Sequence, residues 1–137
     1  MYPKKSIKGL HILLAEDNEL NMEIAEFMLQ NEGADVIKAW NGQEAVELFR
    51  KSEPGEFDVI LMDIMMPVMN GYEATKKIRS LDREDAKMIP IIAMTANAFE
   101  EDKRAAIAAG MNGHIAKPIQ VDKLLLILAE MIRQQKN

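Results

Sequence analysis

FDVILM, residues 57–62, is a nearly continuous apolar run that ends directly at Asp63. Such a run is typical of a parallel strand that is buried on both faces. Three other short apolar runs also end at a polar group: Leu10–Ala15 before Glu16-Asp17, Ile89–Met94 before Thr95, and Gly113–Ala116 before Lys117-Pro118. Open α/β sheets bind ligands outside the carboxyl ends of their strands. We therefore expect three carboxylates, one hydroxyl and one ammonium to converge on one crevice.

Strand-like and helix-like segments alternate five times along the chain. The predicted strands are Leu10–Ala15, Ala34–Ala39, Phe57–Met62, Pro90–Thr95 and Gly113–Ala116. The predicted helices are Glu19–Asn31, a segment around Ala45–Phe49 that ends near Pro54-Gly55, Tyr72–Leu81, Ala98–Ala109 and Val121–Gln134. In the first helix the apolar spacing comes from Leu20, Ile24, Phe27 and Met28, and Asp82–Lys87 is predicted to be a charged connection. Strict alternation indicates an α/β, doubly wound parallel sheet, and the strand order 2-1-3-4-5 fits the length.

Length and composition exclude several classes of protein. The chain has 137 residues, no cysteine and a net charge of −5, which exclude thiol chemistry and argue against a nucleic-acid surface. No apolar run reaches the roughly 18 residues of a membrane span, and none near the start suits a signal peptide. We expect a soluble, cytoplasmic domain at residues 10–134 that inserts into no membrane, with residues 1–9 as a tail.

The expected crevice suits a divalent cation. Three neighbouring carboxylates repel one another, and without a cation one of them would have a raised pKa. Magnesium commonly takes one or two carboxylates plus waters and a phosphate oxygen. We expect Asp17 and Asp63 to be direct ligands, Glu16 to act through water, and the backbone carbonyl of Met65 to complete the set. Asp63 could then attack a phosphoryl group while Lys117 and the cation neutralise its oxygens.

Each residue also has an ordinary interpretation when it is taken alone. Glu16-Asp17 could be a solvated loop, with Asp17 or Asn18 capping the next helix. Thr95 could be a β-branched strand end, and Lys117 a surface lysine before a turn proline. Their common position at predicted strand ends favours one site.

The same residues resemble the receiver domain of two-component response regulators, over about Leu10–Arg133. The matching positions are Glu16-Asp17, Asp63, Thr95, Lys117-Pro118 and the acceptor loop MDIMMPVMNG, residues 62–71. The stretch AEDNELN, residues 15–21, is similar to receivers of hybrid sensor kinases and phosphorelays. The resemblance implies a flavodoxin-like (βα)5 fold. It also implies phosphoryl transfer from a histidine kinase or histidine phosphotransfer protein onto Asp63, with Mg²⁺ or Mn²⁺. Such a module is a signalling domain that catalyses at most its own phosphorylation and dephosphorylation.

The resemblance further implies a switch. Phosphorylation would draw the Thr95 hydroxyl toward the phosphate, and an aromatic residue three positions before the lysine would turn inward. This chain has His114 there, which we interpret as a half-buried strand residue rather than a pH sensor. The Lys117–Pro118 bond is expected to be cis. Met65 and Asn97 would tune the phosphate lifetime, and because Met65 orients water poorly we expect a long-lived acyl phosphate.

The predicted last helix carries more apolar residues than one core stripe needs. That stripe consists of Val121, Leu124, Leu125, Leu128 and Ile132. Leu126 and Ile127 fall outside it and are expected to be exposed, either as ordinary surface residues or as a partner face. Members of the family commonly signal through their fourth helix, fifth strand and fifth helix, here residues 98–134. We expect a monomer or a weak, phosphorylation-dependent dimer.

The chain contains 11 methionines, and Met62, Met65, Met66, Met69 and Met94 lie near the proposed site. We interpret them as flexible core filler.

Three alternative functions remain at this point. A magnesium phosphohydrolase with Asp63 as nucleophile would want a second aspartate at position 65, which is Met65. A flavodoxin-like FMN protein would want a Ser/Thr/Gly-rich loop after the first strand, where Glu16–Glu19 lies. A pseudo-receiver that only docks partners would usually lack one of the site residues, and none is missing.

Overall fold

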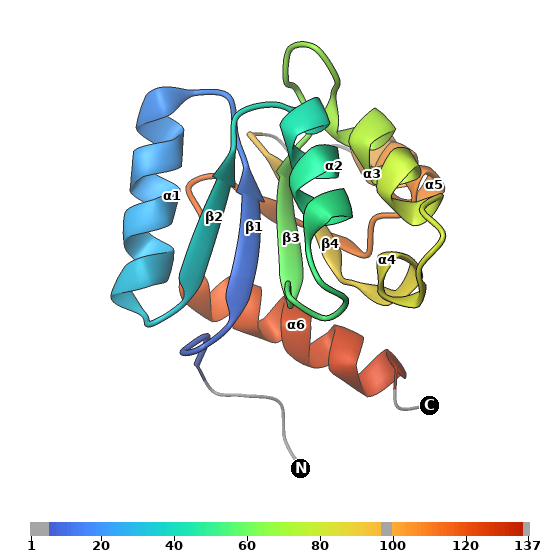
Figure 1. Ribbon diagram of the computed structural model, residues 1–137. Coiled ribbons are helices and arrows are strands. Elements are labelled where there is room, and N and C mark those ends of the chain that lie inside the picture. Colours follow the sequence, from blue (N-terminus) through green and yellow to red (C-terminus); the bar gives the residue numbers. More distant parts are fainter. Residues whose placement is uncertain (1–5, 97–99, 136–137) are drawn as a thin grey trace.

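The computed structural model describes residues 6–96 and 100–135, with side chains for residues 6–96 and 103–130. Its five strands are β1 (His11–Ala15), β2 (Asp35–Ala39), β3 (Val59–Asp63), β4 (Ile91–Thr95) and β5 (Gly113–Ala116). Its helices are α1 (Glu19–Asn31), α2 (Gly42–Lys51), α3 (Gly71–Arg79), α4 (Glu84–Met88), α5 (Glu100–Ala109) and α6 (Val121–Gln135). The strands form one parallel sheet in the order β2-β1-β3-β4-β5 (Figure 1). The predicted doubly wound, flavodoxin-like fold is confirmed.

Two hydrophobic cores lie on opposite faces of this sheet. One packs α2, α3, α4 and α5 against the strands around Phe49, Ile60 and Ile78. The other packs α1 and α6 around Leu14, Leu29 and Leu124. Figure 1 shows α2 in front of the sheet and α6 behind it. Every residue of β3 and β4 is buried, because these central strands are covered on both faces.

Asparagine caps start the three helices that follow β1, β2 and the β3 loop. The side chains of Asn18, Asn41 and Asn70 each accept the backbone N–H three residues further on, at 2.8–2.9 Å. Such caps satisfy amides that the first helical turn leaves without partners. The helices therefore begin close to the carboxyl edge of the sheet.

The face of α1 that packs against the sheet is not the one that carries its large apolar residues Leu20, Ile24 and Phe27. Met22, Ala25 and Leu29 are buried. By contrast, Leu20 is 64% exposed and Phe27 is 68% exposed, and Ile24 is also exposed. Two stripes with helical spacing coexist in this helix, so the period predicted the helix but could not tell which stripe the sheet would cover.

Two segments differ from their predicted character in the structure. The segment Asp82–Lys87, predicted to be a charged connection, forms most of the short helix α4, which ends at Met88. The prediction was wrong because Ala86 packs fully into the core and holds this helix in place. A helix of five residues is too short for its apolar spacing to be recognised in the sequence. Ile7, expected in the tail, is also fully buried, and the N–H of Gly9 bonds the carbonyl of Gly33 at 2.9 Å. The folded unit therefore includes residues before Leu10.

In α6, Leu126 is 71% exposed, as predicted. Ile127 was also expected to be exposed, but it is half-buried and packs against the core. Leu124 is fully buried, and Val121, Leu125 and Leu128 are partly buried beside it. The side chain of Ile132 lies outside the described residues. No helix within the described ranges is long and apolar enough to cross a membrane.

Candidate functional site

The strand ends bring the predicted residues together at one edge of the sheet. Ala15 at the end of β1 is opposite Met62 in β3, so Glu16 and Asp63 emerge side by side. Asp63 is opposite Met94 in β4. Because the register continues across β4 to β5, Thr95 and the residue after Ala116 reach the same edge.

A cavity of about 500 Å³ opens at this edge. It is lined by Glu16, Asp17, Asn18, Asn21, Asp63, Ile64, Met65, Tyr72, Met94, Thr95, Ala96 and Lys117. All five polar groups expected there are present. The sequence does not predict Asn21 or Tyr72 as site residues, and it predicts Asn18 only as a possible helix cap. Their places follow from the way α1 and α3 start beside the strand ends, which no residue pattern shows.

Lys117 bridges two of the carboxylates. Its Nζ lies 2.8 Å from Oε1 of Glu16 and 3.0 Å from Oδ2 of Asp63. Glu16 is only 2% exposed, and its other oxygen accepts the N–H of Asn18 at 3.0 Å. Burial, the largest single influence, lowers the pKa of the Lys117 ammonium. Its hydrogen bonds to the two carboxylates and the attraction of their charges together outweigh burial and raise that pKa above its ordinary value. The ammonium is therefore held charged beside Asp63.

Asp63 is a buried carboxylate with a raised pKa. Burial raises the pKa of its carboxyl from 3.8 to about 6; the hydrogen bond from Lys117 opposes the rise, and the neighbouring Glu16 adds to it. The sequence predicted a raised pKa from repulsion between carboxylates, yet desolvation is the larger cause. At neutral pH the carboxylate is mostly ionised and faces the cavity, as a nucleophile must.

The acidic cluster can also hold a cation. One carboxylate oxygen each from Glu16, Asp17 and Asp63 lies within 4.8 Å of the others. Asp17 is exposed, whereas the other two are buried. Oxygen ligands in this number and spacing fit a hard divalent ion such as Mg²⁺.

The predicted switch residues occupy different environments. Thr95 is buried and lines the cavity. His114 is half-buried in β5 and is absent from the cavity lining. The Lys117–Pro118 peptide bond is cis, as the resemblance implied. Asn97 lies outside the described residues.

The methionine interpretation holds for four residues of the five. Met62, Met66 and Met94 are buried, and Met69 packs against the core. Met65, however, is 78% exposed and lines the cavity, so its interpretation as core filler was wrong. It lies just beyond the end of β3, where the chain has left the buried layer.

The loop after Asp63 is tightly constrained. The N–H of Met69 bonds the carbonyl of Pro67 at 2.7 Å, which places Val68 at the centre of a three-residue turn with φ +69°. A β-branched residue in this region is strained. At Gly71, a Cβ atom would collide with the Asp63 carbonyl oxygen, so glycine is required there.

A second hollow adjoins the site. It measures about 450 Å³ and is lined by Glu16, Asn21, Ile24, Ala25, Met94, Ala96, Lys117, Pro118 and Ile119. Ile24 links it to the exposed stripe of α1. The sequence did not predict this apolar surface beside the site, because residues far apart in the chain form it.

The chain matches a known family model, the response regulator receiver domain, over residues 12–129. It is 40% identical over 127 residues to a probable histidine kinase 2 of rice (Oryza sativa subsp. indica), covering 85% of this chain and 12% of that protein. It is 43% identical over 119 residues to two-component system protein A of Emericella nidulans, covering 86% and 17%. The chain thus spans less than a fifth of the length of these relatives.

Solved structures of receiver domains are also similar to this chain. The receiver domain of a Pseudomonas aeruginosa PAO1 sensor histidine kinase, with a magnesium ion coordinated in its active site cleft, is 40% identical with a TM-score of 0.78. That match covers 91% of this chain and 98% of the other. A Saccharomyces cerevisiae receiver domain, that of Ssk1 in complex with the phosphotransfer protein Ypd1, is 29% identical with a TM-score of 0.76, covering 98% and 93%.

Proposed function

This chain belongs to the response regulator receiver domain family of two-component signalling, and on that premise we propose that it accepts a phosphoryl group on Asp63. The observation that carries the proposal is the contact of Lys117 with Asp63 inside the cavity, 3.0 Å from Nζ to Oδ2. It places a fixed positive charge beside the carboxylate that would receive a negatively charged group.

The bonds made and broken in the proposed reaction balance simply. A carboxylate oxygen of Asp63 forms a new bond to phosphorus, and the phosphorus–nitrogen bond of a phosphohistidine donor breaks. The electron pair of that bond remains on the imidazole nitrogen, which takes up a proton from solvent. The product is an aspartyl phosphate.

Asp17 and Asp63 would hold a magnesium ion directly, Glu16 through water, and the Met65 carbonyl would complete the protein ligands. Mn²⁺ offers the same chemistry. When bound, such an ion neutralises charge on the phosphoryl oxygens. The clustered oxygens support this role, and so does the magnesium in the related Pseudomonas receiver domain.

Thr95 and Lys117 would bind the phosphoryl oxygens once Asp63 is modified. Both lie in the cavity wall, so neither needs a large movement to reach the new group. Displacement of Thr95 at the end of β4 would pass to the α5–β5–α6 surface, which is the family's fourth helix, fifth strand and fifth helix in the present labels. We propose that this surface, with Leu126 exposed on it, carries the signal, and that His114 modifies the movement. Met65, beside Asp63 and unable to orient water well, would give a long-lived phosphate, and Asn97 is the second proposed tuning position.

The donor would be a histidine kinase or a histidine phosphotransfer protein. The exposed stripe of α1 formed by Leu20, Ile24 and Phe27 borders the hollow at Pro118, next to Lys117. An apolar surface adjoining a charged site suits a partner helix that presents a phosphohistidine to Asp63. The Ypd1 complex of a related receiver supports a partner of this class.

The test is the intact mass of the protein after incubation with acetyl phosphate. We expect a magnesium-dependent gain of one phosphoryl group in the native chain and none in Asp63→Asn. The conservative change keeps the shape of the side chain but removes its nucleophilic charge. If the native chain gained no mass and also failed to bind beryllofluoride, the proposal would be wrong and the chain would act as a pseudo-receiver that docks partners only.

A further inference from the structure

Arg79, the last residue of α3, holds the far end of α5. Its Nε and Nη2 donate to the carbonyl of Gly110 at 3.0 and 2.9 Å, immediately after α5 ends. Its Nη1 donates to the carbonyl of Ala86 in α4 at 3.0 Å, and Nη2 also reaches Oδ1 of Asn112 at 2.7 Å. One guanidinium therefore joins α3, α4 and the turn between α5 and β5.

Asn112 extends this contact into the sheet. Its Oδ1 also accepts the N–H of Ile91 at 2.8 Å, and its own N–H donates to the Ile91 carbonyl at 2.8 Å. Ile91 begins β4, the strand that ends at Thr95 in the site. The carboxyl-terminal end of α5 is thus bound to the start of the strand whose other end carries a site residue.

The partners of Arg79 make this contact hard to move. All are neutral oxygens, and the half-buried charge has lost much of its hydration, which lowers the pKa of the guanidinium. The Gly110 carbonyl lies at the carboxyl end of a helix, where a positive charge is favourable. Moving Gly110 would take from this half-buried cation two of its four hydrogen bonds, a larger cost than shifting an exposed helix end.

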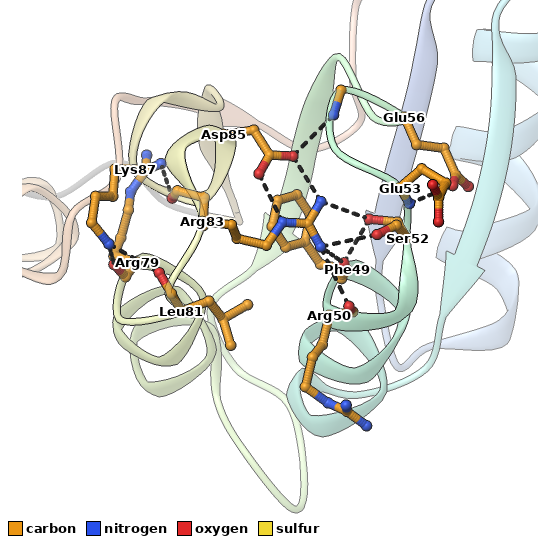
Figure 2. Close-up of polar contacts among 12 residues, drawn as sticks. Phe49, Arg50, Ser52, Glu53, Glu56, Arg79, Leu81, Arg83, Asp85 and Lys87 are labelled. Carbon is orange, nitrogen blue, oxygen red and sulfur yellow. Dashed lines mark hydrogen bonds and ion pairs between the residues drawn. The ribbon is translucent and has the colours of Figure 1, made fainter.

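Arg83 forms a similar contact on the other side of α4. Figure 2 shows its guanidinium reaching the carbonyls that end α2 and paired with the Asp85 carboxylate, which lies above it in this view. The bonds are 2.9 Å to Phe49, 3.0 Å to Ser52 and 2.7 Å to Asp85, and the guanidinium lies 4.6 Å from the centre of the Phe49 ring. Arg83 therefore anchors α4 to α2, and among the residues whose side chains are described it forms no hydrogen bond or ion pair with α5. It supplies a matched control for Arg79.

We propose that Arg79 is a positioning residue that pins the carboxyl-terminal end of α5, so that modification of Asp63 can displace α5 only by turning it about Gly110. The amino-terminal end of the helix, which follows Thr95 in the chain, would then move most, and the region of Gly110 to Asn112 least. This inference rests on the proposed phosphorylation of Asp63. It adds to that function a fixed point, at Gly110, about which α5 turns. This point lies near the edge of the sheet opposite the site.

The experiment is hydrogen exchange with and without acetyl phosphate and magnesium, with the phosphoryl group counted by mass in each sample. In the native chain, phosphorylation should change exchange at the amino-terminal end of α5 by about tenfold or more, and at residues 110–112 by less than about twofold. In Arg79→Gln the amides of residues 110–112 should exchange about tenfold faster at rest, and phosphorylation should now change them as well. Arg83→Gln should loosen α2 but retain the native pattern in α5.

The outcomes separate two failures. If the native chain takes up no phosphoryl group, the proposed function fails, and the mass reports this directly. If phosphorylation occurs but residues 110–112 change as much as the amino-terminal end of α5, the pin is refuted. An Arg79→Gln pattern equal to that of Arg83→Gln would refute it too, because Arg79 would then be only a structural contact. If Arg79→Gln fails to fold, Asn112→Ala is used instead, because it removes one hydrogen-bond acceptor of Arg79. In that variant too, phosphorylation must change the exchange of the amides of residues 110–112.

Discussion

At the scale of the residue, Asp63 is a carboxylate that folding makes less acidic and more reactive at once. Its burial at the end of β3 removes most of the water around the carboxylate. The ion pair with Lys117 compensates in part for this lost hydration. A carboxylate held in this way has lost much of its water shell and therefore stands ready for a cation or a phosphoryl group. The same burial should make the stability of the protein depend on pH.

Because the pKa of Asp63 rises from 3.8 to about 6, the folded state binds more protons than the unfolded state between these values. Stability should therefore fall as pH rises from about 4 to about 6, by up to about 3 kcal/mol for this group. Urea unfolding of the native chain and of Asp63→Asn, both with chelator, measures the effect. The stability of the variant relative to the native chain should increase across this range; a constant difference would show that Asp63 titrates normally.

Thr75 in α3 offers a second prediction at this scale. It is fully buried, and among the described residues its hydroxyl oxygen has no hydrogen-bond partner. Thr75→Val keeps the shape and removes the unsatisfied group, so it should stabilise the protein by about 1 kcal/mol. Thr75→Ser keeps the hydroxyl and loses a buried methyl, so it should destabilise by about 1 kcal/mol. Denaturant unfolding of both variants tests this, and a destabilised valine variant would reveal a partner for the hydroxyl.

Among the helices, α1 carries two apolar stripes, one packed in the core and one that we propose as a docking surface. Its buried stripe, Met22, Ala25 and Leu29, packs against the sheet, whereas Leu20 and Phe27 contribute little to that core. Large apolar side chains at helical spacing on a solvent-facing stripe are typical of a contact surface. The two stripes can therefore be changed independently.

Replacing Leu20 and Phe27 together with serine should change stability by no more than about 0.5 kcal/mol per site, since both are exposed. Uptake of phosphate from acetyl phosphate should stay unchanged. Transfer from a phosphorylated histidine phosphotransfer protein should slow by about tenfold or more, because the docking surface is lost. Stopped-flow or quench-flow transfer rates measure this.

Leu126→Ser is the matched control, since Leu126 is 71% exposed on α6. It should leave transfer unaffected while removing an apolar residue of the proposed output surface. Equal slowing in both variants would argue that α1 has no special part in docking.

At the scale of the whole molecule, the sheet couples the site to global stability. The carboxylates come from the ends of β1 and β3, and both cores pack against these strands. The three oxygens are neighbours only when the sheet is formed, so a cation that binds them binds the folded state alone. Ligands of this kind stabilise by mass action.

Magnesium at ten times its dissociation constant should raise the free energy of unfolding by about 1.4 kcal/mol. For a domain of this size that corresponds to roughly 4 °C in Tm. Asp63→Asn should lose most of the increase, because one of the three carboxylates is gone. Thermal melts with magnesium, with chelator and with sodium chloride at matched ionic strength test this. A rise of the same size in the variant would mean that the ion acts elsewhere.

Much of the architecture could be predicted from local pattern. The alternation of apolar runs and helical periods predicted five parallel strands in their observed order, and polar residues after four of them predicted the site. Those inferences succeed because strand direction and the period of a helix are local properties of the chain. The same reasoning failed at Met65 and Ile127, whose burial depends on what neighbouring segments cover.

The order of residue types along the chain was therefore enough to predict which side chains meet at the sheet edge. Glu16, Asp17, Asp63, Thr95 and Lys117 each lie at or just after the carboxyl end of a strand, and parallel strands align those ends. Three features became visible only in the folded molecule: the sharing of charge among these groups, the stripe of α1 that faces solvent, and the hydrogen bonds from Arg79 to Gly110. The physical reason is that desolvation, ion pairing and coverage depend on atoms brought together from distant parts of the chain. Periodicity and residue type do not specify those distances, which are set only when the sheet and its helices pack together.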